Sequence, residues 1–392
     1  GMDVYISNNS VQFDQTNKHR AKLVFDSFYW MINFGSFFAS LLMPMFLRDY
    51  GPAVAFGIPG LLMAVATLVF WLGRRHYVMV PPAPASPHSF LRVARDALLA
   101  QAPGQGRPGL MLASVGGLCA LAALALAPSQ GIVIAFCLAL VCVIAFGGAG
   151  TWMQLDRARS LHPDEAVEGV RAVLRVLVVF ALVTPFWSLF DQKASTWVLQ
   201  AGGMTRPDWF EPAMMQALNP ALVMLLIPFN NLVLYPLLEL RGIRMSALRR
   251  MTAGMGFAGL AWIVAGSLQL ALDGGDALSI TWQILPYALL TLGEVLVSAT
   301  GLEFAYSQAP AAMKGVIMSF WNLAVTVGNL WVLVANAAVR NSTVLGHIET
   351  TGLSTHAFLM FFFAGFAFCS AIAFGWYARR YRETDNYRSV SA

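Results

Sequence analysis

Long apolar runs set the strongest limit on what this chain can fold into. A helix needs about 20 mostly apolar residues to cross a bilayer, whereas the strands of a membrane barrel alternate over about ten residues. The runs here have helical length, so they predict an all-α membrane protein. Ten of them are present, at 24–47, 53–73, 109–127, 131–153, 173–200, 218–239, 252–272, 278–305, 315–339 and 357–378.

The composition argues against a large soluble all-α protein. Hydrophobic residues make up 58% of the 392 residues and charged residues 11%, whereas a soluble chain carries about 25% charged residues. The net charge of +5 does not indicate nucleic-acid binding, because the basic residues do not gather with aromatic residues on one soluble face. They lie between the apolar runs, where charges set membrane topology.

The placement of these basic residues supports ten spans. If the polar N-terminus is cytoplasmic and the sides alternate, Arg48, Arg206 and Arg340 fall on outer segments and Lys193 falls inside a span. The rest of the 25 lysines and arginines fall on the cytoplasmic side. This asymmetry follows the positive-inside rule. It predicts a multi-pass protein with both termini in the cytoplasm.

The segment between the second and fifth spans differs from the rest. Residues 79–108 are rich in proline, alanine and glycine, and 88–99 could form a short amphipathic helix with Phe90, Ala94 and Leu98 on one face. The third and fourth spans contain no charged residue. We expect them to form a lipid-embedded hairpin that joins two helical bundles.

Two acidic residues stand out because they lie well inside spans, Asp191 and Glu294. A charge at the centre of a membrane helix costs about 2.5–3.5 kcal/mol, so each should face a cavity or a partner. Such a carboxylate can hold a proton near neutral pH or bind an ammonium group, although a structural ion pair between helices is the alternative. Lys193 does not share a helix face with Asp191, and it could snorkel to the interface or pair across helices.

Uncharged polar and aromatic residues also occur inside the spans. Asn33, Asn219 and Ser298 could hydrogen-bond a ligand or a neighbouring helix. Trp187 and Trp321 could form the walls of a cavity or simply pack. We find no nucleophile–base pair and no metal-type spacing, which argues against a membrane enzyme and against a metal site or a cofactor.

Three local motifs resemble one family. Residues 28–36 read FYWMINFGS, residues 186–192 read FWSLFDQ, and residues 285–294 read LPYALLTLGE. Together they resemble the signatures of the proton-dependent oligopeptide transporters, which belong to the major facilitator superfamily, and the resemblance runs from about residue 11 to 380. It implies two bundles of six helices, with two extra linker helices in bacterial members.

The resemblance implies an assignment of the spans. The first two resemble helices 5 and 6, the next two the linker pair, and the last six resemble helices 7–12. The family's helix-one Glu-x-x-Glu-Arg motif and its helix-four lysine are absent from this sequence. We therefore expect an N-terminally truncated member that lacks the first four membrane helices. The implied domains are a cytoplasmic segment at 1–22, a partial N-terminal bundle at 23–78, a linker with the hairpin at 79–165, a C-terminal bundle at 166–383 and a cytoplasmic tail at 384–392.

The resemblance also implies residue roles. Glu294 resembles the glutamate that receives the peptide amino end, and it is implied in proton coupling together with Asp191. The asparagines would contact the peptide, and the tryptophans would shape its side-chain pocket. Substrate binding is thus implied for Asn33, Trp187, Asn219, Glu294, Ser298 and Trp321.

The implied function is proton-coupled symport of di- and tripeptides across the bacterial inner membrane, as part of a peptide transporter. The expected partners are the peptide, protons and the lipid bilayer, with no nucleic acid, and we expect a monomer. Two alternatives remain open. One is a truncated fragment that does not transport, and the other is a relative that carries another small solute such as nitrate.

Overall fold

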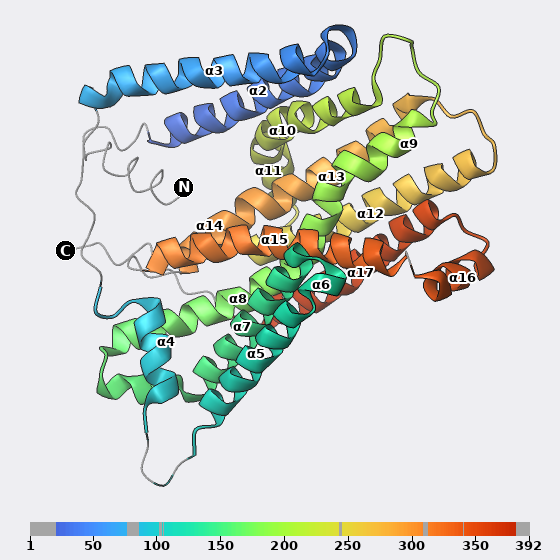
Figure 1. Cartoon of the computed structure of the whole chain (residues 1–392). Coiled ribbons are helices and arrows are strands. Elements are labelled where there is room, and N and C mark those ends of the chain that lie inside the picture. Colours follow the sequence, from blue (N-terminus) through green and yellow to red (C-terminus); the bar gives the residue numbers. More distant parts are fainter. Residues whose placement is uncertain are drawn as a thin grey trace. The chain divides into compact units, whose positions relative to one another are not determined.

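The computed structural model describes residues 21–76, 86–101, 104, 106–242, 245–308, 313–339 and 341–381. The predicted tail at 384–392 and nearly all of the predicted segment at 1–22 lie outside these residues. The described residues are mostly helical, with short loops between the helices, and form no β-strand (Figure 1). All ten predicted spans are confirmed as helices that are long and apolar enough to cross a membrane: Tyr29–Tyr50, Pro52–His76, Pro108–Ser129, Ile132–Ser160, Asp164–Gly202, Pro212–Leu240, Ala247–Asp273, Ile280–Leu302, Lys314–Ala338 and Thr355–Arg380.

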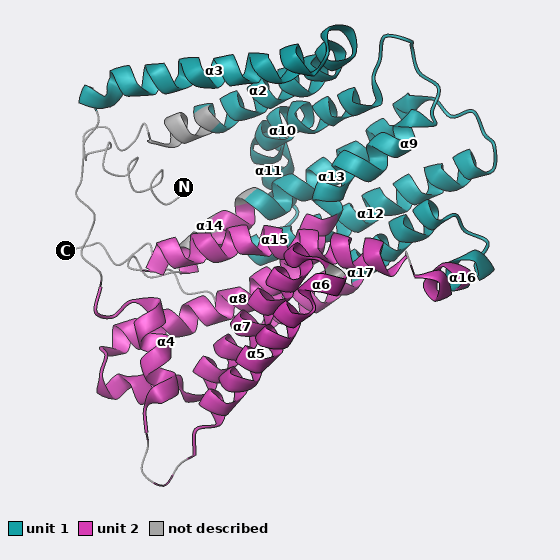
Figure 2. Ribbon diagram, in the orientation of Figure 1, with its two compact units in different colours: residues 1–82, 189–298, 347–368 teal, residues 83–188, 299–346, 369–392 magenta. Residues whose placement is uncertain are grey.

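The contacts within the chain divide it into two compact units (Figure 2). Unit 1 comprises Gly1–Pro82, Leu189–Ser298 and His347–Phe368, and unit 2 comprises Ala83–Ser188, Ala299–Gly346 and Cys369–Ala392. Each of these units combines three separate segments of the chain, whereas the predicted domains are consecutive ranges of the sequence. The two divisions describe different things, so the predicted domain boundaries stay a prediction.

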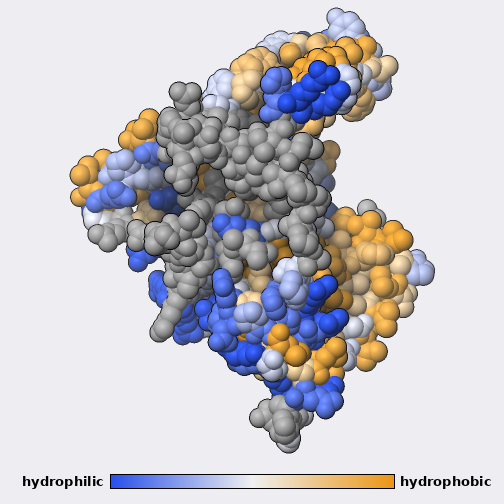
Figure 3. All heavy atoms as spheres, turned by 90° about the vertical axis from the view of Figure 1, so that its left-hand side faces the viewer, coloured by the Kyte–Doolittle hydropathy of each residue, from blue (hydrophilic) through white to orange (hydrophobic). Residues whose placement is uncertain are grey.

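Unit 1 begins with helices α2 (Ala21–Tyr50) and α3 (Pro52–Gly73). Gly51 joins them with φ of +80°, a conformation that glycine adopts without steric cost, and Pro52 suits the first turn of α3. Many apolar side chains of α3 are exposed, including Phe56, Leu61 and Phe70. Such a surface suits contact with lipid, and hydrophobic residues are also spread over the flanks of the face shown in Figure 3.

Small residues bring two helices of unit 1 close together. On α12 (Ala247–Asp273) and α13 (Ile284–Glu294), a Cβ atom added at Gly254 would lie 2.7 Å from the Gly293 carbonyl oxygen, and one added at Gly293 would lie 2.7 Å from the Gly254 carbonyl oxygen. Glycines at such a crossing allow the backbones of membrane helices to approach closely. The crossing fixes the position of the residue that follows Gly293, which is Glu294.

Three membrane spans contain a π-helical turn, at Lys193–Trp197, Asn230–Leu234 and Val295–Ala299. Turns of this kind are uncommon and are often found at functional sites. The first begins at Lys193, and the third begins directly after Glu294. The remaining helices of this part of unit 1 are α9 (Val198–Gly202), α10 (Leu218–Phe229) and α11 (Tyr235–Leu240).

The third and fourth spans form the predicted hairpin, within unit 2. Its long helices are α5 (Pro108–Ala125) and α7 (Ile132–Gln154), joined by the short α6 (Ala127–Gln130). A Cβ atom added at Gly109 would lie 2.2 Å from the Gly150 carbonyl oxygen, so the two backbones nearly touch. Gln154 stabilises the polar end of the hairpin, because its Oε1 accepts from the Gly109 amide at 3.1 Å.

The predicted amphipathic helix is present as α4 (Phe90–Leu99), but its buried face shares only Phe90 with the predicted one. The buried residues are Phe90, Val93 and Ala97, whereas Ala94 and Leu98 are only partly buried. α4 packs on α7 and on the 3₁₀ turn Leu155–Ser160, and Gln154 Nε2 donates to the carbonyl oxygen of Ala97 at 2.9 Å. The face is therefore set by protein packing, which the amphipathic pattern alone did not specify.

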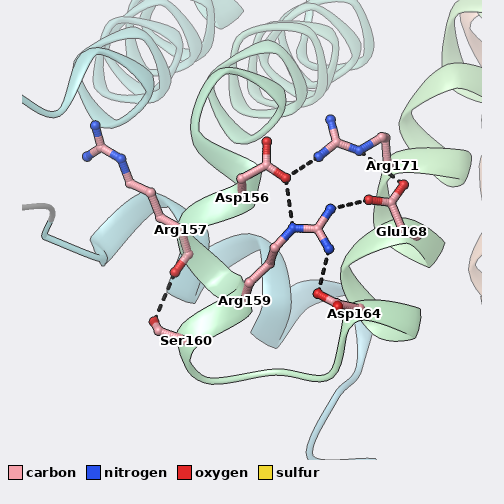
Figure 4. Close-up of polar contacts among 7 residues, drawn as sticks. All are labelled: Asp156, Arg157, Arg159, Ser160, Asp164, Glu168 and Arg171. Carbon is pink, nitrogen blue, oxygen red and sulfur yellow. Dashed lines mark hydrogen bonds and ion pairs between the residues drawn. The ribbon is translucent and has the colours of Figure 1, made fainter.

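A network of charged side chains links the end of the hairpin to α8 (Asp164–Gln192) (Figure 4). Arg159 pairs with Asp156 at 3.0 Å, with Asp164 at 2.5 Å and with Glu168. Arg171 also reaches Asp156, at 2.6 Å. The network ties the start of the fifth span to the turn that precedes it.

Unit 2 contains another close helix crossing, between α8 and α15 (Lys314–Ala338). A Cβ atom added at Gly328 would lie 2.6 Å from Cβ of Trp187 and 2.8 Å from the Thr184 carbonyl oxygen, so α15 approaches α8 closely at this level. Trp331 Nε1 donates to Thr184 Oγ1 nearby, at 3.1 Å. The helices after α13 are α14 (Thr300–Gln308), α15 (Lys314–Ala338), α16 (Ser342–Thr350) and α17 (Thr355–Arg380).

Candidate functional site

The polar centre of unit 1 is built around Glu294, the last residue of α13. Asn219, in the first turn of α10, donates from Nδ2 to Glu294 Oε2 at 2.6 Å. The same Nδ2 lies 3.1 Å from Thr291 Oγ1, one helical turn before Glu294. Through these two contacts Asn219 holds the Glu294 side chain in place beside Thr291.

A buried cation lies near this carboxylate. Lys193 is 7% exposed, and its Nζ lies 3.1 Å from the centroid of the Phe190 ring, a cation–π arrangement. The carboxylates of Glu294 and Asp191 both interact electrostatically with the Lys193 ammonium. This burial argues against snorkelling of Lys193 to the interface, and a pair of Lys193 across helices stays a prediction.

Asp191 and Ser298, which the sequence singled out, belong to the same unit. Both are partly buried. Asp191 lies two residues before the first π turn, and Ser298 is within the third, Val295–Ala299. The structure thus places Asp191 two residues before Lys193 in the same span, and it places Ser298 one helical turn beyond Glu294.

The α2 helix contributes a residue that sequence reasoning missed. Tyr29 lies within electrostatic reach of Glu294. Asn33, the predicted residue, donates from Nδ2 to the carbonyl oxygen of Tyr29 at 2.9 Å, so its amide bonds to its own helix. Tyr29 could have been found, because it lies in the same FYWMINFGS motif as Asn33.

The two predicted tryptophans meet each other within unit 2. The ring centroids of Trp187 and Trp321 are 5.7 Å apart at 87°, an edge-to-face pair. Trp321 also packs edge-to-face on Phe180 at 5.4 Å. Both tryptophans are buried, at 7% and 6% exposure. They form one aromatic cluster.

Comparison with known proteins identifies the family. The model of the POT family matches residues 7–104 and 150–352. The chain belongs to the POT family. Solute carrier family 15 member 2 of Homo sapiens is 31% identical to this POT family chain over 271 residues, which cover 67% of the chain and 32% of the relative. The corresponding protein of Mus musculus is 30% identical over 277 residues, with the same shares of each chain.

Solved structures of the family share the fold. The crystal structure of an auto-inhibited POT family peptide transporter is 67% identical, with a TM-score of 0.93, and covers 97% of this chain and 74% of its own. The in meso structure of the POT family transporter PepTSo is 64% identical, with a TM-score of 0.94, and covers 97% of this chain and 75% of its own. The chain is therefore a multi-pass membrane protein of the major facilitator superfamily type. It spans about a third of the length of the curated relatives that it matches.

Proposed function

We propose that this chain is part of a transporter that moves di- and tripeptides together with protons across the inner membrane of a bacterium, with both termini in the cytoplasm. The observation that carries the proposal is the cluster of Glu294, Asp191 and Lys193 inside membrane spans. Charges are placed there at a cost, and the cost is justified where they serve transport. Solved members of the family described as peptide transporters support the peptide as cargo.

The charge balance of the cluster explains how two cargoes could be linked. Two carboxylates and one ammonium leave a net charge of −1 when all three are ionised. One further positive charge neutralises the cluster, and it can arrive as a proton or as the ammonium end of a peptide. Symport requires both cations to be carried in the same step, so in this proposal the peptide ammonium binds Glu294 while the proton binds Asp191. Binding of one cargo then favours binding of the other.

The remaining site residues take supporting roles in this proposal. Asn219 fixes the Glu294 carboxylate and offers its amide to the peptide, and Asn33 and Ser298 contact the peptide backbone. Trp187 and Trp321 set the preference for peptide side chains. The chemistry is binding and translocation, so we propose a transporter rather than an enzyme, and no cofactor is required.

Uptake into proteoliposomes tests the proposal. The 392-residue chain and a version extended at its N-terminus to the length of the solved relatives would each be supplied with a labelled dipeptide under an inward proton gradient. Accumulation that collapses with a protonophore supports proton-coupled peptide transport. Uptake by the extended form alone would identify the 392-residue chain as a non-transporting fragment. Uptake of nitrate without peptide uptake by either form would contradict the proposal.

A further inference from the structure

A cavity of about 600 Å³ lies wholly within unit 2. Its walls come from α7, α8 and α15, with Tyr377 of α17. This volume is in the usual range of ligand pockets, roughly 300–1,000 Å³. The peptide-transport proposal uses none of its lining residues.

Small residues of the hairpin create this space. Ala145, Gly148 and Ala149 of α7 face it and follow the spacing of one helix face. The lining of α7 extends from Val141 to Met153, near the C-terminal end of the helix, about 18 Å at 1.5 Å per residue. One leaflet of a bilayer core is roughly 15 Å deep, half of about 30 Å. The length of this groove therefore matches the depth of one leaflet, and the helices that form its walls cross the membrane.

One end of the groove is basic and aromatic. Among the described residues that line it, Arg175 alone carries a charge, and its side chain is exposed. The Arg175 guanidinium carbon lies 5.8 Å from the ring centroid of Trp152, and Tyr377 Oη donates to the Arg175 carbonyl oxygen at 3.2 Å. Tryptophan and tyrosine are typical of the headgroup level of a membrane. This end therefore marks the interface.

The neighbouring arginine differs in its partners. Arg171 stacks near the same Trp152 ring, at 5.4 Å, but it is engaged by Asp156 at 2.6 Å and by Glu168 at 3.3 Å. No ion pair of Arg175 with an acidic side chain is found in the part of the chain that the structure describes. Arg175 is therefore the cation at the groove mouth that can take an anion from outside the protein.

We propose that this groove binds a phospholipid with an anionic headgroup, with one acyl chain along α7 and the phosphate on Arg175. The length and apolar lining fit an acyl chain, and the charge at the mouth fits a phosphate. Basic pockets between membrane helices on the cytoplasmic side bind anionic lipid headgroups, and Arg175 lies on that side by the distribution of basic residues. A zwitterionic lipid would bring its own cation close to Arg175 and bind less well.

Native mass spectrometry of the detergent-solubilised chain tests this proposal. Phosphatidylglycerol and phosphatidylcholine with identical acyl chains would be titrated, and the affinity of the first bound lipid compared. Wild type should prefer phosphatidylglycerol, and Arg175→Gln should weaken its binding about five-fold. Arg175→Lys should keep most of the preference. Arg92→Gln is the matched control, because Arg92 is also exposed and basic in unit 2 but does not line the groove.

A second variant tests the acyl-chain wall. Ala145→Phe fills the groove, so the first molecule of either lipid should bind more weakly, while the melting temperature reports whether the helices still pack. Equal affinity of wild type and Arg175→Gln for phosphatidylglycerol would overturn the headgroup assignment. Unchanged lipid affinity of a folded Ala145→Phe variant would overturn the groove itself.

Discussion

Asn219 Nδ2 donates to Glu294 Oε2 over 2.6 Å, the contact that orients the carboxylate at the centre of unit 1. The two residues come from α10 and α13 and lie 75 positions apart in the sequence. If Glu294 binds the peptide ammonium, the amide that holds its carboxylate should matter almost as much as the carboxylate itself.

Replacement of Asn219 by alanine should therefore weaken peptide binding. A hydrogen bond to a charged group is worth about 1.5–3 kcal/mol, which corresponds to at least about ten-fold in affinity. Isothermal titration with a dipeptide would measure the change. Ser267→Ala is the control, because Ser267 Oγ bonds to the Ile263 carbonyl of its own helix. Equal affinity of Asn219→Ala and wild type would exclude this role.

The membrane spans could be predicted from the sequence because length and hydropathy alone decide whether a helix can cross a bilayer. The contacts of Asp191, Lys193 and Glu294 could not, because they depend on how helices pack and on π turns that interrupt the regular helical period. Lys193 shows the difference. Its long side chain suggested snorkelling, whereas in the structure the side chain is buried and its Nζ lies over the ring of Phe190, three residues earlier in the same span. The buried face of α4 was misjudged for the same reason.

The crossing of α12 and α13 gives a prediction about stability. Gly254→Ala places a methyl group within 2.7 Å of the Gly293 carbonyl oxygen, so the helices must separate, at a cost of about 1–3 kcal/mol. The melting temperature should fall, and peptide binding should weaken because Glu294 shifts with its helix.

The same helix offers a matched control for this substitution. A Cβ atom added at Gly256 meets nothing within 4 Å, so Gly256→Ala should leave stability unchanged or raise it by up to about 1 kcal/mol through helix propensity. If both variants melted at the same temperature, close glycine packing would not be what positions α13.

The docking of α4 should depend on acid pH through Asp96. Hydrogen bonds from Arg95 and then from His162 hold the pKa of the Asp96 carboxyl below its usual range. An ionised carboxylate only accepts, so His162 Nε2 donates to it over 3.1 Å. Because the folded pKa is the lower one, the stabilisation is complete above the unfolded value of about 3.9 and is lost as pH falls through the folded pKa.

Hydrogen exchange of the α4 amides would measure this dependence, after correction for intrinsic rates. Protection in wild type should be constant near neutral pH and weaken below about pH 4. Asp96→Asn should reduce protection at pH 7 and remove the acid-dependent loss. Glu165→Gln, which removes an exposed carboxylate in the first turn of α8, should behave as wild type. An acid-dependent loss that persists in Asp96→Asn would assign it to another group.

The most direct test of proton-coupled peptide transport is to measure proton entry after addition of a peptide. The N-terminally extended form would be reconstituted in liposomes that contain a pH-sensitive dye, and an unlabelled dipeptide would be added outside. We predict that the interior acidifies with the wild-type protein and that Glu294→Gln shows no peptide-dependent acidification. Acidification by Glu294→Gln at the wild-type rate would contradict the proposed link between peptide and proton at Glu294.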